Sequence, residues 1–199
     1  MASIDTTTAF WTWFSAHSAE LGAADIPQAL IDQLEERLFA IHRLDWEIGP
    51  GLETPNLFAL SPRGDRSTLV ITREIIAQAP KLKGWSFYPA KPPRQWNLVF
   101  SLNVDGKEIE IDGKRWQFVA YKFDDGTFDL VFKPDKQEGL SPDYLNWAAI
   151  IIADGEIGEE RRMDLIGNIE VVGAWDEKIG ASAQTLELGL LAKVLSDKR

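Results

Sequence analysis

The stretch that decides the fold runs from Leu98 to Lys133 and reads LVFSLNVDGKEIEIDGKRWQFVAYKFDDGTFDLVFK. Apolar and polar residues alternate over most of it, as they do in strands that bury one face. Asp-Gly pairs, which are a strong signal for hairpin turns, stand at three junctions between these runs: Asp105-Gly106, Asp112-Gly113 and Asp125-Gly126. Together with a further strand over Trp85–Ala90, the pattern predicts a central antiparallel β-meander.

Helical patterns precede this meander. Two apolar stripes at helical spacing are separated by a short turn at Gly22, and they consist of Phe10, Phe14, Leu21, Leu30, Leu34, Leu38 and Ile41. Two helices joined in this way pack as a hairpin. Short strands are predicted over 44–48 and 57–60, and a third helix over 67–78.

The chain returns to helical patterns after the meander. A helix is predicted from Ser141 to about Ala153, and its centre is apolar nearly all round, so we expect Trp147 to be buried. A core strand over 165–172 and a terminal helix over 184–195 follow. The whole pattern predicts one α+β domain over 1–199, in which a mostly antiparallel sheet packs against the N-terminal helical hairpin and further helices.

Composition restricts the class of protein. The chain has 199 residues, of which 45 % are hydrophobic and 26 % are charged, as in an ordinary globular domain. It contains no Cys, so disulfides, thiolate metal sites and cysteine nucleophiles are excluded. No basic segment precedes the first apolar cluster, and no apolar run is long enough to cross a bilayer. We therefore expect a cytoplasmic protein that does not enter a membrane.

One segment runs against the acidic background. The formal net charge is -10, yet the residues from Ile75 to Val104 include no Asp or Glu, whereas the first thirty-six residues include no Lys or Arg. Basic and aromatic residues are interleaved in this segment, and the candidate partner-binding residues are Lys81, Lys83, Trp85, Tyr88, Lys91, Arg94 and Trp96. Such residues are typical of interface hot spots and would attract an acidic protein partner. Single-stranded nucleic acid is disfavoured because the chain as a whole is acidic; the remaining alternative is a charged strand edge that aids solubility.

No motif for catalysis or for a cofactor is present in the sequence. His17 lies on the apolar stripe of the first helix and His42 ends the second, and neither has a second ligand at metal spacing. The acids between Asp154 and Asp164 lack the order of a calcium loop and enclose two arginines, so we expect a solvated connection there. Glycine-rich phosphate loops and nucleophile elbows are absent from the sequence. We expect no catalytic residues, no metal and no cofactor.

Two motifs mark a resemblance. They are Phe10-Trp11-Thr12-Trp13-Phe14 near the N-terminus and Ala79-Pro80-Lys81-Leu82-Lys83-Gly84-Trp85 in the middle. With these motifs the chain resembles, over most of its length, a family of small bacterial proteins of unknown function. The resemblance implies a cytoplasmic domain in a bacterium and brings no activity and no catalytic residues. In size and acidity the chain is also similar to many immunity proteins that neutralise bacterial toxins.

These observations lead to two functional hypotheses. The first is a non-catalytic protein-binding or immunity-like module, which would bind through the aromatic and basic segment or through the acidic helical hairpin. The second is a small hydrolase that uses paired carboxylates in a cleft, because such pairs leave no motif in a sequence. A pocket with converging polar side chains of shifted pKa favours the enzyme, whereas an exposed aromatic surface favours binding.

Overall fold

The chain has two separate hydrophobic cores. The computed structural model describes residues 4–135, 140–180, 182–187 and 189–196, and it divides the chain into two compact units, Met1–Lys91 and Pro92–Arg199. Each core lies within one unit. The single domain expected over 1–199 stays a prediction, and each unit is described by itself.

The first unit packs a helical hairpin against a small sheet. Its elements are α1 (Ile4–Leu21), α2 (Gln28–Ile41), β1 (Asp45–Pro50), β2 (Asn56–Ser61), α3 (Arg66–Ile76) and β3 (Trp85–Tyr88). The sheet has the order β1-β2-β3, with β1 antiparallel and β3 parallel to β2. The α1–α2 hairpin is the one that the two apolar stripes predict, and Leu30, Leu34 and Leu38 of α2 are buried as expected.

Aromatic side chains fill the core between this hairpin and the sheet. Phe14 and Phe58 are completely buried, with ring centroids 5.1 Å apart, and Trp11 makes an edge contact with Phe87 at 5.0 Å. The indole N–H of Trp11 donates to the carbonyl of Ile75 over 2.9 Å. A buried indole needs such a partner, because an unsatisfied donor would cost about 1–3 kcal/mol. The FWTWF motif is therefore a core motif of this unit.

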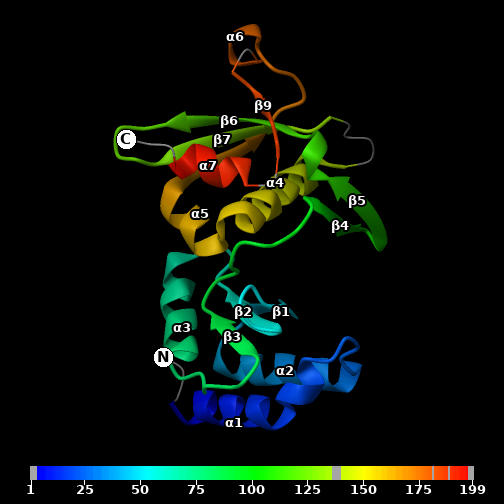
Figure 1. Ribbon diagram of the computed structural model, residues 1–199, viewed down its shortest axis with the longest axis vertical. Helices are drawn as coiled ribbons and strands as arrows, with labels where there is room; N and C mark the ends of the chain where they lie inside the picture. Colours follow the sequence, from blue (N-terminus) through cyan, green and yellow to red (C-terminus); the bar gives the residue numbers. More distant parts are fainter. Residues whose placement is uncertain (1–3, 136–139, 181, 188, 197–199) are drawn as a thin grey trace. The chain divides into compact units, whose positions relative to one another are not determined.

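The second unit contains two separate sheets. Its elements are β4 (Val99–Val104), β5 (Lys107–Asp112), η1 (Gly113–Arg115), β6 (Gln117–Lys122), β7 (Phe128–Lys133), α4 (Pro142–Ile157), α5 (Glu159–Leu165), β8 (Ile166–Val171), α6 (Glu177–Gly180), β9 (Gln184–Thr185) and α7 (Leu190–Ser196). β4 and β5 form a hairpin of their own, whereas the larger sheet has the order β8-β7-β6-β9. α4 packs against β8 and α7, and its inner face joins the core of this unit (Figure 1).

The predicted α+β class with mostly antiparallel sheets is confirmed, but the continuous meander is divided. Asp105-Gly106 and Asp125-Gly126 turn the hairpins β4–β5 and β6–β7, as predicted. Asp112-Gly113 instead leads into η1: Asp112 accepts a hydrogen bond from Lys114 N–H, and Gly113 N–H donates to the carbonyl of Leu98 over 2.8 Å. A Cβ on Gly113 would lie 2.9 Å from that carbonyl oxygen. This glycine therefore serves a close backbone approach, not a hairpin turn.

Three further expectations need correction. Trp147 is 50 % exposed, because α4 turns small and aliphatic residues such as Ala148, Ala149 and Ile152 inward. The terminal helix begins only at Leu190. Gln184–Thr185 form β9 instead, and Leu186 is buried beside Trp116, to whose carbonyl its N–H donates. The acidic stretch after residue 153 is not a solvated connection, because it forms the C-terminal end of α4 and then α5. Two of its carboxyl groups, those of Glu156 and Glu159, are buried.

Candidate functional site

An open groove of about 700 Å³ lies beside α2 in the first unit. Its walls come from the outer face of α2, the start of β1, the turn after β2 and the end of this unit. It is lined by Asp32, Glu35, Glu36, Phe39, Arg43, Leu44, Asp45, Trp46, Arg63 and Lys91. We call it the α2 groove. Acidic, basic and aromatic side chains meet there within one unit.

The α2 wall of the groove is acidic and ends in an exposed aromatic ring. Asp32, Glu35 and Glu36 are exposed, because the leucine stripe turns the opposite side of α2 to the core. Phe39 stands one turn after Glu35 and is 70 % exposed. Phe39 therefore offers an exposed aromatic ring beside charged residues, and aromatic side chains are among those that serve as anchors in protein interfaces.

A tight turn carries the basic side of the groove. Asp65 N–H donates to the carbonyl of Pro62 over 3.0 Å, and Arg63 and Gly64 both have positive φ, 53° and 78°. These values match a type I′ turn, which normally prefers Asn-Gly because a side chain such as that of arginine is disfavoured at positive φ. Arg63 therefore occupies an unfavourable backbone conformation at the rim of the groove.

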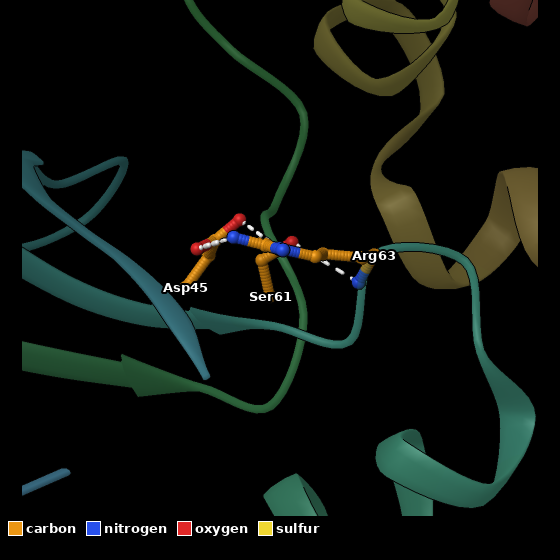
Figure 2. Close-up of polar contacts among 3 residues, drawn as sticks. All are labelled: Asp45, Ser61 and Arg63. Carbon is orange, nitrogen blue, oxygen red and sulfur yellow. Dashed lines mark hydrogen bonds and ion pairs between the residues drawn. The ribbon is translucent and has the colours of Figure 1, made fainter. Parts of the chain in front are cut away.

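The Arg63 guanidinium pairs with Asp45 at the start of β1. Its Nε and Nη2 donate to the two carboxylate oxygens of Asp45, while Arg63 N–H donates to Ser61 Oγ over 3.3 Å (Figure 2). The side-chain hydrogen bond to Asp45 is the main reason why the pKa of Arg63 is raised; burial opposes this effect and the attraction to the Asp45 charge adds to it. The pair joins two segments of the groove wall and neutralises Asp45.

The same turn also starts α3. Asp65 caps this helix: its carboxylate accepts hydrogen bonds from Ser67 Oγ at 2.5 Å and from Thr68 N–H at 2.6 Å. These bonds favour the charged form and lower the pKa of Asp65 to about 2. The Arg63-Gly64-Asp65 tripeptide is thus a turn followed by a helix cap.

The structure distributes the predicted partner-binding residues over both units. Lys81 and Lys83 are exposed, Tyr88 is half-buried and Lys91 lines the α2 groove. Trp85 is buried in the first core, where its ring makes an edge contact with Phe14 at 5.0 Å. A buried tryptophan is not available to a docking partner.

The last two of these predicted residues, Arg94 and Trp96, belong to the second unit. The Arg94 guanidinium lies 5.7 Å from the centre of the Trp96 ring. Trp96 also packs closely on α4, because a Cβ on Gly155 would lie 2.4 Å from its Cζ2 atom. This part of the segment therefore contributes to the packing of the second unit.

A smaller hollow of about 420 Å³ in the second unit contains a buried carboxyl group. It is lined by Arg94, Gln95, Trp96, Glu156 and Gly189. Glu156 is only 6 % exposed and accepts a hydrogen bond from Gly189 N–H over 2.7 Å. Burial raises its pKa, while the Gly189 N–H and the Trp96 side chain oppose this effect. The indole N–H of Trp96 is itself buried and has no partner in hydrogen-bond geometry in the described parts of the chain.

The two histidines have structural surroundings, in agreement with the sequence interpretation. The half-buried ring of His17 stacks on Trp13 at 5.0 Å, and His17 Nδ1 is 2.9 Å from the carbonyl oxygen of Trp13. His42 N–H bonds the carbonyl of Leu38 at the end of α2. Within the described residues, no group of three or more His, Asp or Glu side chains has the arrangement of a metal site. None of the described helices combines the length and the apolar character that a bilayer span requires.

No match to the chain was found among protein-family models, characterised proteins or solved structures. The sequence analysis does not identify Phe39 or Arg63 as site residues. Phe39 lies off the buried leucine stripe, and the spacing of the residues around Arg63 indicates no role for its side chain.

Proposed function

We propose that the chain is a non-catalytic protein-binding module and that its partner docks in the α2 groove. The observation that carries the proposal is Phe39, which is 70 % exposed at an open groove whose other side is rich in charged residues. Interfaces with this composition place an aromatic anchor in the middle and charged residues at the rim. Leu44 and Trp46, which are half-buried, add apolar surface to the same groove.

The energy available from Phe39 is large enough to matter for binding. An aromatic side chain buries about 150–250 Å² in a complete transfer from water. With 70 % of Phe39 still exposed, a partner that covers it removes roughly 140 Å² from water, which corresponds to about 3.5 kcal/mol at about 25 cal/mol per Å². A difference of about 3.5 kcal/mol changes a dissociation constant by roughly three-hundredfold.

The experiment compares two variants of the same unit as baits. Phe39→Ala removes the proposed anchor, whereas Val70→Ala trims a side chain of α3 that is 53 % exposed and lies outside the groove. Tagged wild-type protein and both variants are used to purify partners from cells that carry the gene. We expect the wild type and Val70→Ala to retain the same protein and Phe39→Ala to lose it. Retention of that protein by Phe39→Ala contradicts a docking site at the groove.

The acidic-partner hypothesis for the basic segment is tested by the same comparison. Lys81 and Lys83 are the exposed cations of that segment in the first unit. If Lys81→Glu with Lys83→Glu abolishes capture while Phe39→Ala retains it, the binding surface is the basic segment and the partner is acidic. An immunity-like role is a special case of the proposal, in which the captured protein is a toxin.

One observation favours the alternative, a hydrolase that uses paired carboxylates. Glu156 combines a raised pKa with a place at a hollow, and a general acid requires both properties. A second carboxyl nearby in sequence, that of Asp154, is held by Arg162 in a largely buried ion pair. The test is hydrolysis of a set of glycosides and esters: an activity that Glu156→Gln removes and Phe39→Ala leaves unchanged establishes the enzyme and refutes the proposed non-catalytic role.

A further inference from the structure

We infer that the α2 groove selects a basic segment of its partner, one that carries an apolar residue flanked by Lys or Arg. This inference rests on the proposed function and adds the chemistry of the ligand to it. It follows from the balance of available charges around Phe39, from the spacing along α2 and from the charge of the whole helical hairpin.

The acids of α2 are available to a partner. Glu35 and Glu36 are exposed and form no ion pair or hydrogen bond with other residues in the described ranges, and Asp32 accepts only a hydrogen bond from the uncharged Gln28, over 2.8 Å. Arg37, the only basic residue of α2, lies over the ring of Trp13 at 5.0 Å and is not part of the groove lining. The α2 wall therefore presents three carboxylates whose charge is not neutralised within this helix.

The basic residues of the groove do not neutralise these three carboxylates. Arg63 is engaged by Asp45 through both of its donor groups, and Lys91 also has an interaction within the chain. This leaves Arg43, at the end of the groove beyond α2, opposite three acids. The helical hairpin before Arg37 has the same sign, because it holds no Lys or Arg. An acidic ligand would meet like charges along the whole wall, whereas a basic ligand would be attracted before contact.

The geometry of α2 sets the distance between the acids and Phe39, and hence the spacing of the matching residues in a partner. Asp32 and Phe39 are seven positions apart, which is about 10 Å along a helix that rises 1.5 Å per residue. An extended segment covers about 10 Å in three residues. Glu35 and Glu36 lie between these two positions, at one turn from Phe39 and from Asp32. A partner whose apolar residue covers Phe39 would thus place cations one to three residues away opposite the acids.

The probe is a library of random twelve-residue peptides displayed on phage and selected against the full-length chain, and each selected peptide is then tested for binding to Phe39→Ala. We expect the selected peptides to combine one aromatic or aliphatic residue with Lys or Arg within three positions of it. For a synthetic peptide of this kind, Glu35→Lys with Glu36→Lys should weaken binding by about tenfold or more at low salt, with a smaller effect at high salt. The control with the same change of net charge is Glu53→Lys with Glu74→Lys, because both glutamates are exposed in the same unit but lie outside the groove.

The outcomes separate this inference from the proposal on which it rests. Peptides that depend on Phe39 but are acidic or neutral, or that bind with no dependence on salt, overturn the basic ligand and leave the docking groove in place. Peptides that bind equally well to Phe39→Ala, or the absence of any peptide that binds above background, contradict the groove itself. An equal loss of affinity in Glu53→Lys with Glu74→Lys also overturns the inference, since it shows that only the net charge of the unit matters.

Discussion

Replacing Gly155 with alanine tests how closely Trp96 packs against α4 at the smaller hollow of the second unit. Gly155 is buried within α4, and the helix preference of alanine alone would stabilise the variant by about 1 kcal/mol. The added Cβ, however, would lie 2.4, 2.8 and 3.0 Å from three atoms of the Trp96 ring. A rigid ring cannot yield at one atom only, so the ring or the helix has to move. Overpacking of this kind costs about 1–3 kcal/mol, and we expect a net loss of roughly 1–2 kcal/mol of unfolding free energy.

The assay is urea unfolding followed by circular dichroism, with Gly155→Ala measured alone and together with Trp96→Phe. The smaller phenylalanine ring removes the atoms that the new Cβ meets, so the double variant should recover most of the loss. The coupling between the two sites should then exceed about 1 kcal/mol, as is usual for residues in direct contact. The reasoning is refuted if Gly155→Ala stabilises the protein or if the two changes are additive, because Trp96 would then not lie against α4.

Three further predictions concern single groups. Burial raises the pKa of Glu156 above its ordinary value of 4.5, so the folded state holds this proton more tightly than the unfolded chain does. The stabilisation that the bound proton provides is therefore lost as the pH rises above 4.5. Glu156→Gln should remove this part of the pH dependence between about pH 4 and 8 and should be at least as stable as the wild type at about pH 7; an unchanged dependence of the unfolding free energy on pH would contradict this prediction. Trp147→Ala should cost only about 1–2 kcal/mol in urea unfolding, instead of the 3–5 kcal/mol of a buried aromatic residue, because its side chain is half exposed; a larger loss would place it in the core. Lys81→Glu with Lys83→Glu should shift the unfolding free energy by no more than about 0.5 kcal/mol, because both side chains are exposed, and a loss of folding would show that they are structural.

Local patterns predicted the elements of the fold better than their pairing. The leucine stripe of α2 and two of the three Asp-Gly turns are where the sequence places them, because these signals act between residues that are close in the chain. The partner of the strand at Trp85 is not local: β3 pairs in parallel with β2, across α3, and no pattern within β3 indicates this. Trp147 was assigned to the core because α4 is apolar nearly all round, and such a helix gives no periodic signal for its buried face.

Of the candidate site, only the exposure of its acidic residues could be predicted from the sequence. The exposure of Asp32, Glu35 and Glu36 follows from their position opposite the leucine stripe. The exposure of Phe39 does not, since an aromatic residue in a helix is usually assigned to a core. The pairing of Arg63 with Asp45 depends on a strand register and on a turn with positive φ, and neither can be read from spacing alone.

The most direct test of the central claim is a photo-crosslinking experiment on the α2 groove. A photoreactive phenylalanine analogue is placed at Phe39 in one preparation and at Val70, the exposed position on α3, in another. Each is irradiated in the presence of a partner, or of a selected basic peptide, that the wild type binds. The docking proposal predicts a covalent adduct at position 39 and none at position 70. Equal adducts at both positions, or an adduct at position 70 alone, would contradict it.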